Sequence, residues 1–302
     1  MLILLLIVTV CFFFLGIYLL HLGILKVDDA FIMNNLKKFS SQKYVTILFG
    51  MIITAIFQSS SLITICLMSL MSKKLLSLHQ ALWLLLGANI GTTITNQLFV
   101  LNFNFIIFCL FLLFLLFFIK KQFSYLWITS GLLLLFISLE IFGQLGTILI
   151  QDNLIIKLLP YLSNPFNGLV IGTLMAAIMQ SSSAAIGIIQ KIVENQILNL
   201  NHVLFIIYGQ NIGTCITGLM ASIHAGKDEK KVMIFQILIN VFGLILFLIY
   251  NHFFKVNLFI RSSYTLGSMQ VAMFQSSYNI ISVILLLPFD DLFIKVVNKI
   301  YR

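Results

Sequence analysis

The sequence predicts an all-α polytopic membrane protein made of two inverted-topology repeats, and three observations lead to this fold class. Hydrophobic residues make up 61% of the chain and charged residues only 9%. With a mean hydropathy of +1.10, the chain lies far outside soluble globular usage. A pair of polar motifs occurs twice at one fixed offset. The Lys and Arg residues also divide unequally between the two predicted sides of a membrane.

The duplication is carried by polar residues in an apolar background. Gln-Ser-Ser-Ser stands at 58–61 and again at 180–183, and Asn-Ile-Gly-Thr follows each copy 31 residues later, at 89–92 and 211–214. The offset between the copies is 122 for both motifs. Without gaps, residues 50–96 share 17 of 47 positions with the segment 122 residues later. The hydroxyls, amides and glycines kept between the copies are typical of ligand binding.

The apolar windows are taken in chain order. Residues 2–25 have no preceding Lys or Arg of a signal peptide and overlie a mid-chain segment at the repeat offset, so they are predicted to be a true first span. Windows 44–72 and 166–193 carry Gln-Ser-Ser-Ser near their centres and are nearly 30 residues long. Since a helical span needs ~20 residues, each is either one overlong span or a hairpin of two ~14-residue arms with its tip at mid-bilayer.

The positive-inside rule decides between these alternatives. If both windows are re-entrant, 14 of the 18 Lys and Arg residues share one side and 4 lie opposite; if both windows span, the division is 11 to 7. The hairpin arrangement is therefore predicted, with the N-terminus outside and the C-terminus in the cytoplasm of a cell-membrane protein. Three crossings per repeat then invert the second copy relative to the first.

Each remaining window predicts a single span. The chain is predicted to divide into repeat 1 at 1–122, repeat 2 at 123–251, and a final span with a cytoplasmic tail at 252–302. Glycines at the second motif of each copy predict that its helix breaks there and frees backbone carbonyls. The single-span windows are 79–100, 103–119, 124–146, 200–222, 231–251 and 268–288, and the glycines are Gly87, Gly91, Gly209 and Gly213.

Each hairpin tip has the chemistry of an anion site. Its serines can cap the returning arm, whose first amide N–H groups are unpaired and lie at the positive end of the helix dipole. No Lys or Arg occurs in 44–72 or 79–119, so an anion there needs other cations for compensation. Thr92 and Thr95, like Thr214 and Thr217, are three apart and can offer oxygens to Na⁺ from one helix face. The competing interpretation is that these small residues only pack membrane helices.

These motifs resemble the type II sodium-dependent phosphate cotransporter family, its bacterial members in particular. The resemblance runs from the first span and the segment 35–39 through both motif pairs to Pro288-Phe289. It implies that both serine triplets line a phosphate site and that a sodium site uses Gln58, Ser181, the backbone at Gln210, Thr214 and Thr217. In full, the expected phosphate residues are Ser59, Ser60, Ser61, Ser181, Ser182 and Ser183. The expected sodium residues are Gln58, Thr92, Thr95, Gln180, Ser181, Gln210, Thr214 and Thr217, supported by Asn89, Asn211, Gln236 and Gln275.

Three positions depart from the family pattern. Family members usually have a small residue where Gln210 stands, and many have His in place of Gln236 and Gln275. Many bacterial members continue into a cytoplasmic helical domain of the phosphate-regulatory type, which makes a separate regulatory protein an expected partner. Glu140, the one acid well inside a predicted span, has no acidic counterpart in the first copy, and a structural role is expected for it.

The predicted function is sodium-driven import of inorganic phosphate by alternating access, with Na⁺ as coupling ion and no organic cofactor. Alternatives are another small oxyanion, proton coupling, or a non-transporting scaffold or sensor in phosphate signalling. An enzyme is not expected, since no Ser/His/Asp set, metal cluster or carboxylate pair shares a common depth. No nucleic-acid partner is expected, because the basic residues form no patch with interleaved aromatics. A homo-oligomer is possible.

Overall fold

The structure is a computed structural model, and all of its regular secondary structure within the described residues is helical. The all-α part of the prediction is therefore confirmed. The expected segment 35–39 lies outside the described residues. These residues are 2–26, 42–57, 59–72, 74–98, 103–151, 161, 164–179, 181–193, 198, 200–223, 225–254 and 267–301.

The chain forms two compact units, which are described separately. Unit 1 contains residues 1–38 and 99–158, and unit 2 contains residues 39–98 and 159–302. Each unit thus draws on both sides of the predicted repeat boundary at 122. The division into repeats remains a prediction, because repeats are defined by sequence similarity whereas compact units are defined by packing.

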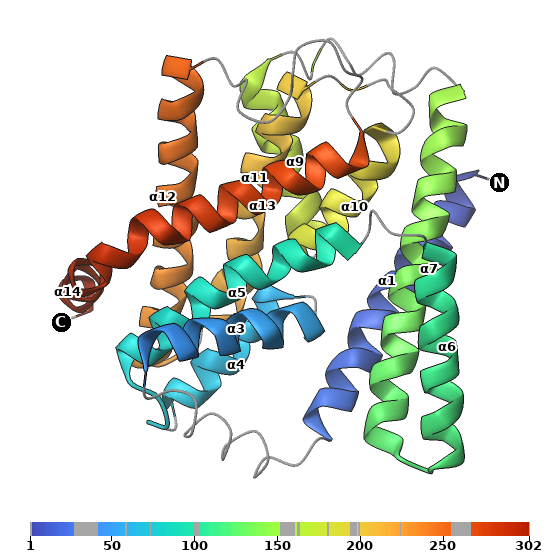
Figure 1. Ribbon diagram of the computed structural model, residues 1–302, viewed down its shortest axis with the longest axis horizontal. Coiled ribbons are helices and arrows are strands. Elements are labelled where there is room, and N and C mark those ends of the chain that lie inside the picture. Colours follow the sequence, from blue (N-terminus) through green and yellow to red (C-terminus); the bar gives the residue numbers. More distant parts are fainter. Residues whose placement is uncertain are drawn as a thin grey trace. The chain divides into compact units, whose positions relative to one another are not determined.

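The described part of unit 1 contains the helices α1 (Leu2–Leu25), α6 (Phe103–Ile119) and α7 (Phe123–Gln151). Glycines allow α1 to lie close against α7: a Cβ on Gly16 would stand 3.0 Å from the Gly131 carbonyl, and one on Gly23 would stand 2.6 Å from the Ile128 nitrogen. Since rising numbers in α1 meet falling numbers in α7, this pair is antiparallel (Figure 1).

Unit 2 contains the duplicated motifs, and both predicted hairpin windows are helix pairs in it. Ser59 and Ser181, the second motif residues, are not helical, and the second helix of each pair begins at the third motif residue. The first pair is α3 (Lys43–Phe57) and α4 (Ser60–Ser72), and the second is α9 (Pro165–Met179) and α10 (Ser182–Val193). The other helices are α5 (Leu78–Leu98), α11 (Leu200–Ala221), α12 (Lys227–Phe254), α13 (Ser268–Leu286) and α14 (Asp290–Ile300), with a 3₁₀ turn at Leu287–Phe289.

In the first copy, glycines bring α3 and α5 into backbone contact. A Cβ on Gly87 would stand 2.0 Å from the Ile47 carbonyl oxygen, and one on Gly91 would stand 2.4 Å from the Met51 carbonyl oxygen. Numbers rise together in the two helices, so α3 and α5 are parallel. The chain between two parallel neighbours has to return, and α4 is the returning segment.

The second copy repeats these contacts at the same offset of 122. A Cβ on Gly209 would stand 2.0 Å from the Leu169 carbonyl oxygen, and one on Gly213 would stand 2.3 Å from the Thr173 carbonyl oxygen. Helices α9 and α11 are therefore parallel as well, and α10 returns between them. The duplicated glycines are explained by this close approach, because any larger residue would meet the neighbouring backbone.

The expected helix breaks at Asn-Ile-Gly-Thr are wrong. Both α5 and α11 continue through the motif without interruption. Glycine permits a break but does not require one, and here the missing side chain serves helix packing. The breaks occur instead at Gln-Ser-Ser-Ser, where the chain passes from the first arm of each pair to the second.

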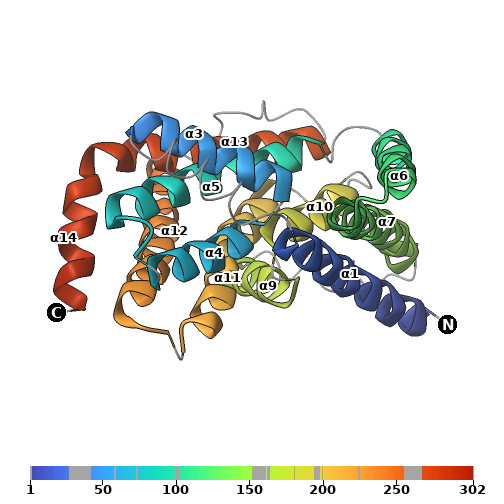
Figure 2. The same ribbon diagram turned by 90° about the horizontal axis from the view of Figure 1, so that it is seen from below.

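The two copies pack across each other inside unit 2. Helix α4 of the first copy packs on α11 and α12, whereas α10 of the second copy packs on α5 and α13 (Figures 1 and 2). A buried cluster that includes Tyr208, Phe247, Phe274 and Tyr278 joins α11, α12 and α13. Each returning arm is thus held against the motif-bearing helix of the other copy.

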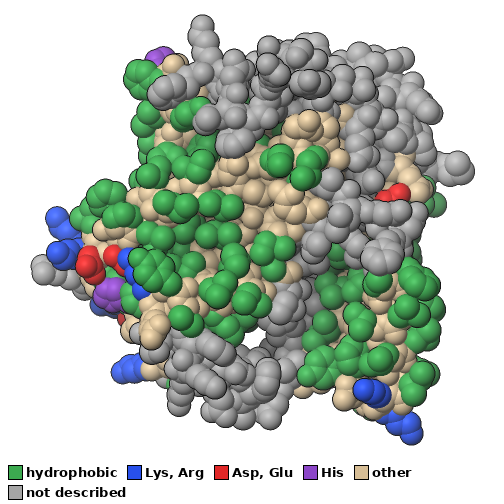
Figure 3. All heavy atoms as spheres, in the orientation of Figure 1, with side chains coloured by type: hydrophobic (Ala, Val, Ile, Leu, Met, Phe, Trp, Pro, Cys, Tyr) green, Lys and Arg blue, Asp and Glu red, His purple; other side chains and the backbone are tan. Residues whose placement is uncertain are grey.

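By length and hydropathy, two stretches of the described residues are suited to cross a membrane, His202–Ala221 in α11 and Lys227–Phe253 in α12. Five shorter apolar helices accompany them, among them both first arms. In unit 2, hydrophobic side chains cover much of the face over α3, α5 and α13, and charged side chains gather near α14 (Figure 3).

Candidate ligand site

The site is built on the starts of the two returning helices. Ser59 accepts the first helical hydrogen bond of α4 through its carbonyl, from the Ile63 N–H at 3.3 Å. Ser181 does the same for α10, from the Ala185 N–H at 3.2 Å. The other four motif serines, Ser60, Ser61, Ser182 and Ser183, are buried. Both serine triplets therefore stand at helix N-termini within unit 2, as the sequence predicts.

Direct bonds connect the second tip to the first copy's motif helix. The Ser183 hydroxyl donates to the Thr92 carbonyl at 3.3 Å. Further along α10, the Gln190 amide donates to the Asn96 carbonyl at 3.1 Å and to the Ser268 carbonyl at 3.2 Å. These bonds bring a phosphate-site candidate beside a sodium-site candidate of the opposite copy. Sequence reasoning missed Gln190, which has no polar counterpart in the first copy.

The second motif has one geometry in both copies. The Asn89 side chain donates to the Leu85 carbonyl at 3.2 Å, and the Asn211 side chain donates to the Ile207 carbonyl at 2.9 Å. The Thr92 hydroxyl donates to the Asn89 carbonyl at 2.8 Å, and the Thr214 hydroxyl donates to the Asn211 carbonyl at 2.7 Å. Because each threonine hydroxyl uses its proton in this bond, its oxygen keeps lone pairs that can accept a hydrogen bond or bind a cation.

Helices α12 and α13 add polar groups that sequence reasoning partly missed. The Asn240 side chain donates to the Asn211 carbonyl at 2.9 Å, and Gln275 and Asn211 exchange side-chain contacts at 3.3 and 3.4 Å. The Asn279 amide reaches the Thr92 hydroxyl at 3.5 Å. Gln275 was expected at the site, whereas Asn240 and Asn279 were not. The signal for them is a Gln-x-x-x-Asn spacing shared by 236–240 and 275–279.

Several buried polar atoms at the site have no hydrogen-bond partner within the described part of the chain. They include the Ser61 and Thr217 hydroxyls and both side-chain amide atoms of Gln210 and Gln236. Leaving a buried polar group unpaired costs about 1–3 kcal/mol. Oxygen-rich, uncharged groups of this kind fit a cation such as Na⁺, and the adjacent hydroxyls and helix N-termini fit an oxyanion.

Charged side chains are scarce in this interior. Among the residues whose side chains are described, no Lys or Arg is buried, and Asp290 and His202 are the buried members of the Asp, Glu and His set. The same residues contain no group of three or more His, Cys, Asp or Glu placed to hold a metal ion. A ligand at this site would therefore meet hydroxyls, amides and helix dipoles.

Three expected site residues are not placed by the structure: Gln58 and Gln180 lie outside the described residues, and nothing is described of the Thr95 side chain. The other predicted residues all belong to unit 2. Glu140 belongs to α7 of unit 1, whereas the duplicated motifs belong to unit 2.

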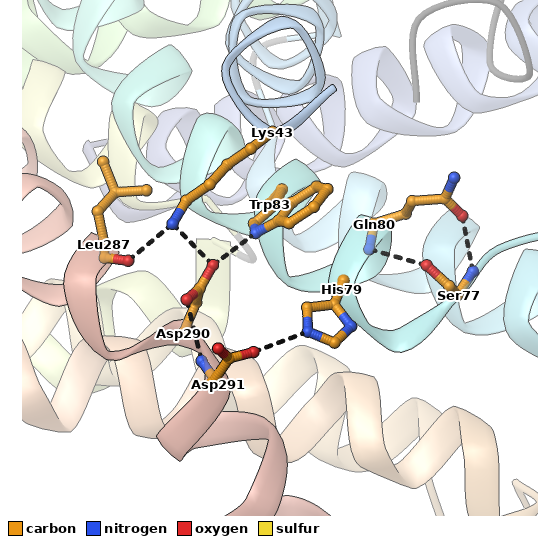
Figure 4. Close-up of polar contacts among 8 residues, drawn as sticks. All are labelled: Lys43, Ser77, His79, Gln80, Trp83, Leu287, Asp290 and Asp291. Carbon is orange, nitrogen blue, oxygen red and sulfur yellow. Dashed lines mark hydrogen bonds and ion pairs between the residues drawn. The ribbon is translucent and has the colours of Figure 1, made fainter. Parts of the chain in front are cut away.

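A charged cluster lies beside the start of α3, the first helix of the first pair (Figure 4). Lys43 at the start of α3 pairs with the Asp290 carboxylate at 2.8 Å, and the Trp83 indole N–H donates to the same carboxylate at 3.0 Å. His79 approaches the Asp291 carboxylate at 3.1 Å. The starts of α3 and α5 therefore meet at the same two aspartates, which supports a segment that doubles back between them.

The Asp290 carboxyl is held in its charged form. Burial opposes ionisation, but hydrogen bonds from Lys43 and Trp83 and the positive charge of Lys43 outweigh it, so the pKa of Asp290 is lowered from its ordinary value. This carboxylate links the first arm, the motif helix α5 and the C-terminal helix α14.

Within the described residues, the structure combines an all-helical fold with two helix pairs that carry the duplicated motifs and an interior rich in hydroxyl and amide groups. The family model described as Na⁺/Pi-cotransporter matches residues 12–144 and 149–283. The chain therefore belongs to the Na⁺/Pi-cotransporter family, as the resemblance predicts.

Relatives of this chain include full-length and partial matches. YqeW of Bacillus subtilis (strain 168) is 27% identical over 293 residues, which cover 96% of this chain and 95% of YqeW. YjbB of Escherichia coli (strain K12), named for inorganic phosphate export, is 24% identical over 91% of this chain. The match covers 51% of YjbB, so the chain spans about half of that protein. Sodium-dependent phosphate transport protein 2A of Rattus norvegicus is 36% identical over 87 residues, 29% of this chain and 13% of that protein. No solved structure matches.

Proposed function

We propose that this protein is a sodium-coupled transporter of inorganic phosphate that works by alternating access. The observation that carries the proposal is the convergence of both motif pairs in unit 2, where Ser183 bonds to Thr92 across the copies and Gln210 and Thr217 keep buried polar atoms without partners. Both serine triplets would contact phosphate. Na⁺ would be bound by the second-motif oxygens and would offset the charge of the anion.

The fold offers a route to alternating access. In each copy the helix pair and the helix that follows it run forward, back and forward again, so the first and third helices are parallel. The two pairs are the re-entrant hairpins of the proposal. In secondary transporters, inverted repeats of this kind move as bundles around a central site. The packing of α4 on α11 and of α10 on α5 supports this proposal, because a movement of either arm would alter its contact with the motif helix of the other copy.

Transport direction has two candidates. Import is the first, because an inward Na⁺ gradient is the ordinary driving force of a sodium symporter. Export is the second, and it is favoured by the name of YjbB, which matches 91% of this chain.

The test is transport of radiolabelled phosphate in liposomes that contain the purified protein in a known orientation. We expect accumulation with an inward Na⁺ gradient and little with choline or K⁺ in its place. Equal uptake in choline would contradict sodium coupling. A proton gradient, arsenate and sulfate are the comparison conditions for the alternatives. Loss of preloaded phosphate without uptake under any inward Na⁺ gradient would favour export.

A further inference from the structure

The C-terminal helix α14 has three distinct faces. One face, with Asp290, Ile294 and Val297, is buried. It packs against α5 and α12, and the Phe293 ring lies edge-on to Phe242 of α12 at 6.2 Å between centroids. The expected cytoplasmic tail is therefore a docked helix from Asp290 onward, and it leaves two faces uncovered.

The second face is an exposed apolar stripe. It contains Phe289, Leu292, Val296 and Ile300, whose exposed fractions are 52, 55, 39 and 55%. Their spacings of three, four and four residues place them along one side of a helix. Four large apolar side chains in a row at the surface call for an apolar partner.

The third face is polar and carries positive charge. It contains Asp291, Lys295 and Lys299, which are four residues apart and exposed, together with Asn298. At about 100° per residue the buried, apolar and polar stripes are roughly a third of a turn from one another. Such a helix can touch protein on one side, hydrocarbon on the second and charged head groups or water on the third.

The direction of α14 agrees with a position in the membrane plane. Figures 1 and 2 show it running crosswise to both α12 and α13. Helix α12 is long and apolar enough to cross a membrane. Helix α14 follows the apolar α13 after only the 3₁₀ turn at Leu287–Phe289, and the Lys43–Asp290 pair fixes its start (Figure 4). Its depth is therefore that of the end of α13.

We propose that α14 is an interfacial helix that binds the lipid bilayer in which the protein resides. Phe289, Leu292, Val296 and Ile300 enter the boundary between acyl chains and head groups, and Lys295 and Lys299 contact anionic head groups. A second copy of the chain is the competing occupant of the apolar stripe. The charged stripe beside it favours lipid, because head groups supply both the apolar and the anionic contact.

The first experiment measures depth with a fluorescent label on a single cysteine, after replacement of the four native cysteines. In proteoliposomes, labels on Leu292→Cys and Ile300→Cys should be quenched by lipids brominated near the head group and protected from aqueous iodide. The matched label on Asn298→Cys should be quenched by iodide. Equal iodide quenching at Leu292 and Asn298 would overturn the proposal. Disulfide crosslinking between copies at Leu292→Cys in dilute vesicles would also overturn it, in favour of a dimer.

The second experiment tests the head-group contacts. The melting temperature of detergent-solubilised protein is followed during titration with phosphatidylglycerol, with phosphatidylcholine as the neutral lipid. The double variant Lys295→Gln and Lys299→Gln should need more phosphatidylglycerol for the same rise, roughly fivefold for each lysine removed. Lys120→Gln with Lys121→Gln, two exposed lysines of unit 1, is the matched control. An identical titration in all three proteins would overturn the anionic contact.

Discussion

At the residue scale, the two duplicated motifs should have separable roles. Thr217→Ala removes a buried hydroxyl that has no partner among the described residues, and it should raise the Na⁺ concentration for half-maximal uptake more than it raises the phosphate concentration. Ser182→Ala should show the opposite bias. A lost hydrogen bond to a charged ligand costs roughly 1.5–3 kcal/mol, on the order of 10- to 150-fold in affinity. Uptake titrated in turn with Na⁺ and with phosphate measures both constants.

The matched control is Thr129→Ala in unit 1, where a buried threonine hydroxyl bonds to the Tyr125 carbonyl within its own helix. It removes the same group from a unit that contains neither motif and should leave both constants unchanged. If Thr217→Ala and Ser182→Ala both keep wild-type constants, these hydroxyls only pack helices.

The duplicated residues could be predicted from the sequence because they recur at one fixed offset. Ser183, Thr92 and Thr214 were predicted from recurrence at one offset, and the structure brings them into unit 2. Gln190, Asn240 and Asn279 have no duplicate at that offset, so recurrence cannot find them. They belong to the site because helix packing brings them beside the motif residues, to which they bond across long sequence separations.

At the element scale, the glycine contacts control helix pairing. Gly209→Ala places a Cβ 2.0 Å from the Leu169 carbonyl oxygen, a backbone atom that cannot rotate away. Helices α9 and α11 would have to separate, and overpacking of this kind costs about 1–3 kcal/mol or more. Gly226→Ala is the control, since its nearest atom would be 3.8 Å away. Thermal unfolding of the purified variants should show a lower melting temperature for Gly209→Ala alone.

A second element-scale prediction concerns the link between α3 and α14. Asp290→Asn leaves Lys43 without its charged partner and should destabilise the protein by roughly 1.5–3 kcal/mol at neutral pH. Asp228→Asn breaks a part-buried pair with Lys231 three residues along the same helix and should cost at most about 1 kcal/mol. Melting temperatures at pH 7 compare the two.

The pH dependence of this effect has a defined sign. Because folding lowers the pKa of Asp290, its stabilisation is present above the unfolded pKa of about 4 and is lost as the pH falls through the lower folded pKa. The gap between wild type and Asp290→Asn should therefore stay constant from pH 7 to 5 and close in more acidic buffer. A gap that closes between pH 7 and 5 would contradict this assignment.

The elements themselves were predictable where composition decides them. Long apolar windows gave helices, and the excess length of 44–72 and 166–193 indicated two arms in each. The continuity of α5 and α11 was not predictable, because glycine is compatible with a break and with a close contact. The helix at 290–300 was missed because its apolar stripe is short and lies beside charged residues.

At the scale of the whole molecule, the lysine distribution predicts which loops share a side. In a background without the native cysteines, Ser77→Cys should be labelled by an impermeant thiol reagent only from the cytoplasm and Tyr161→Cys only from outside. Both side chains are exposed in the structure. Labelling of both from one side would remove the inverted arrangement of the hairpins.

The two halves of unit 2 are similar in sequence but differ in their bonds. Ser183 donates to the Thr92 carbonyl, whereas its counterpart Ser61 has no partner within the described residues. Likewise Gln190 bonds to the Asn96 carbonyl, but its counterpart 122 residues earlier is Met68. Under the proposed alternating access, a second arrangement would give Ser61 the kind of bond that Ser183 has here.

If the copies exchange roles, the equilibrium between the two arrangements depends on positions where the copies differ and on the helices outside the repeats. A hydrogen bond is worth about 1 kcal/mol, and a bias of that size changes the ratio of two states roughly fivefold. Gln190→Met makes the copies alike at one such position. We expect it to shift a Ser61→Cys reporter toward labelling from the opposite side, with Met68→Gln acting in reverse. Unchanged labelling in both variants would contradict the exchange. On this account, the differences between the two copies decide which side of the membrane the site faces at rest, and a single side chain can change that preference.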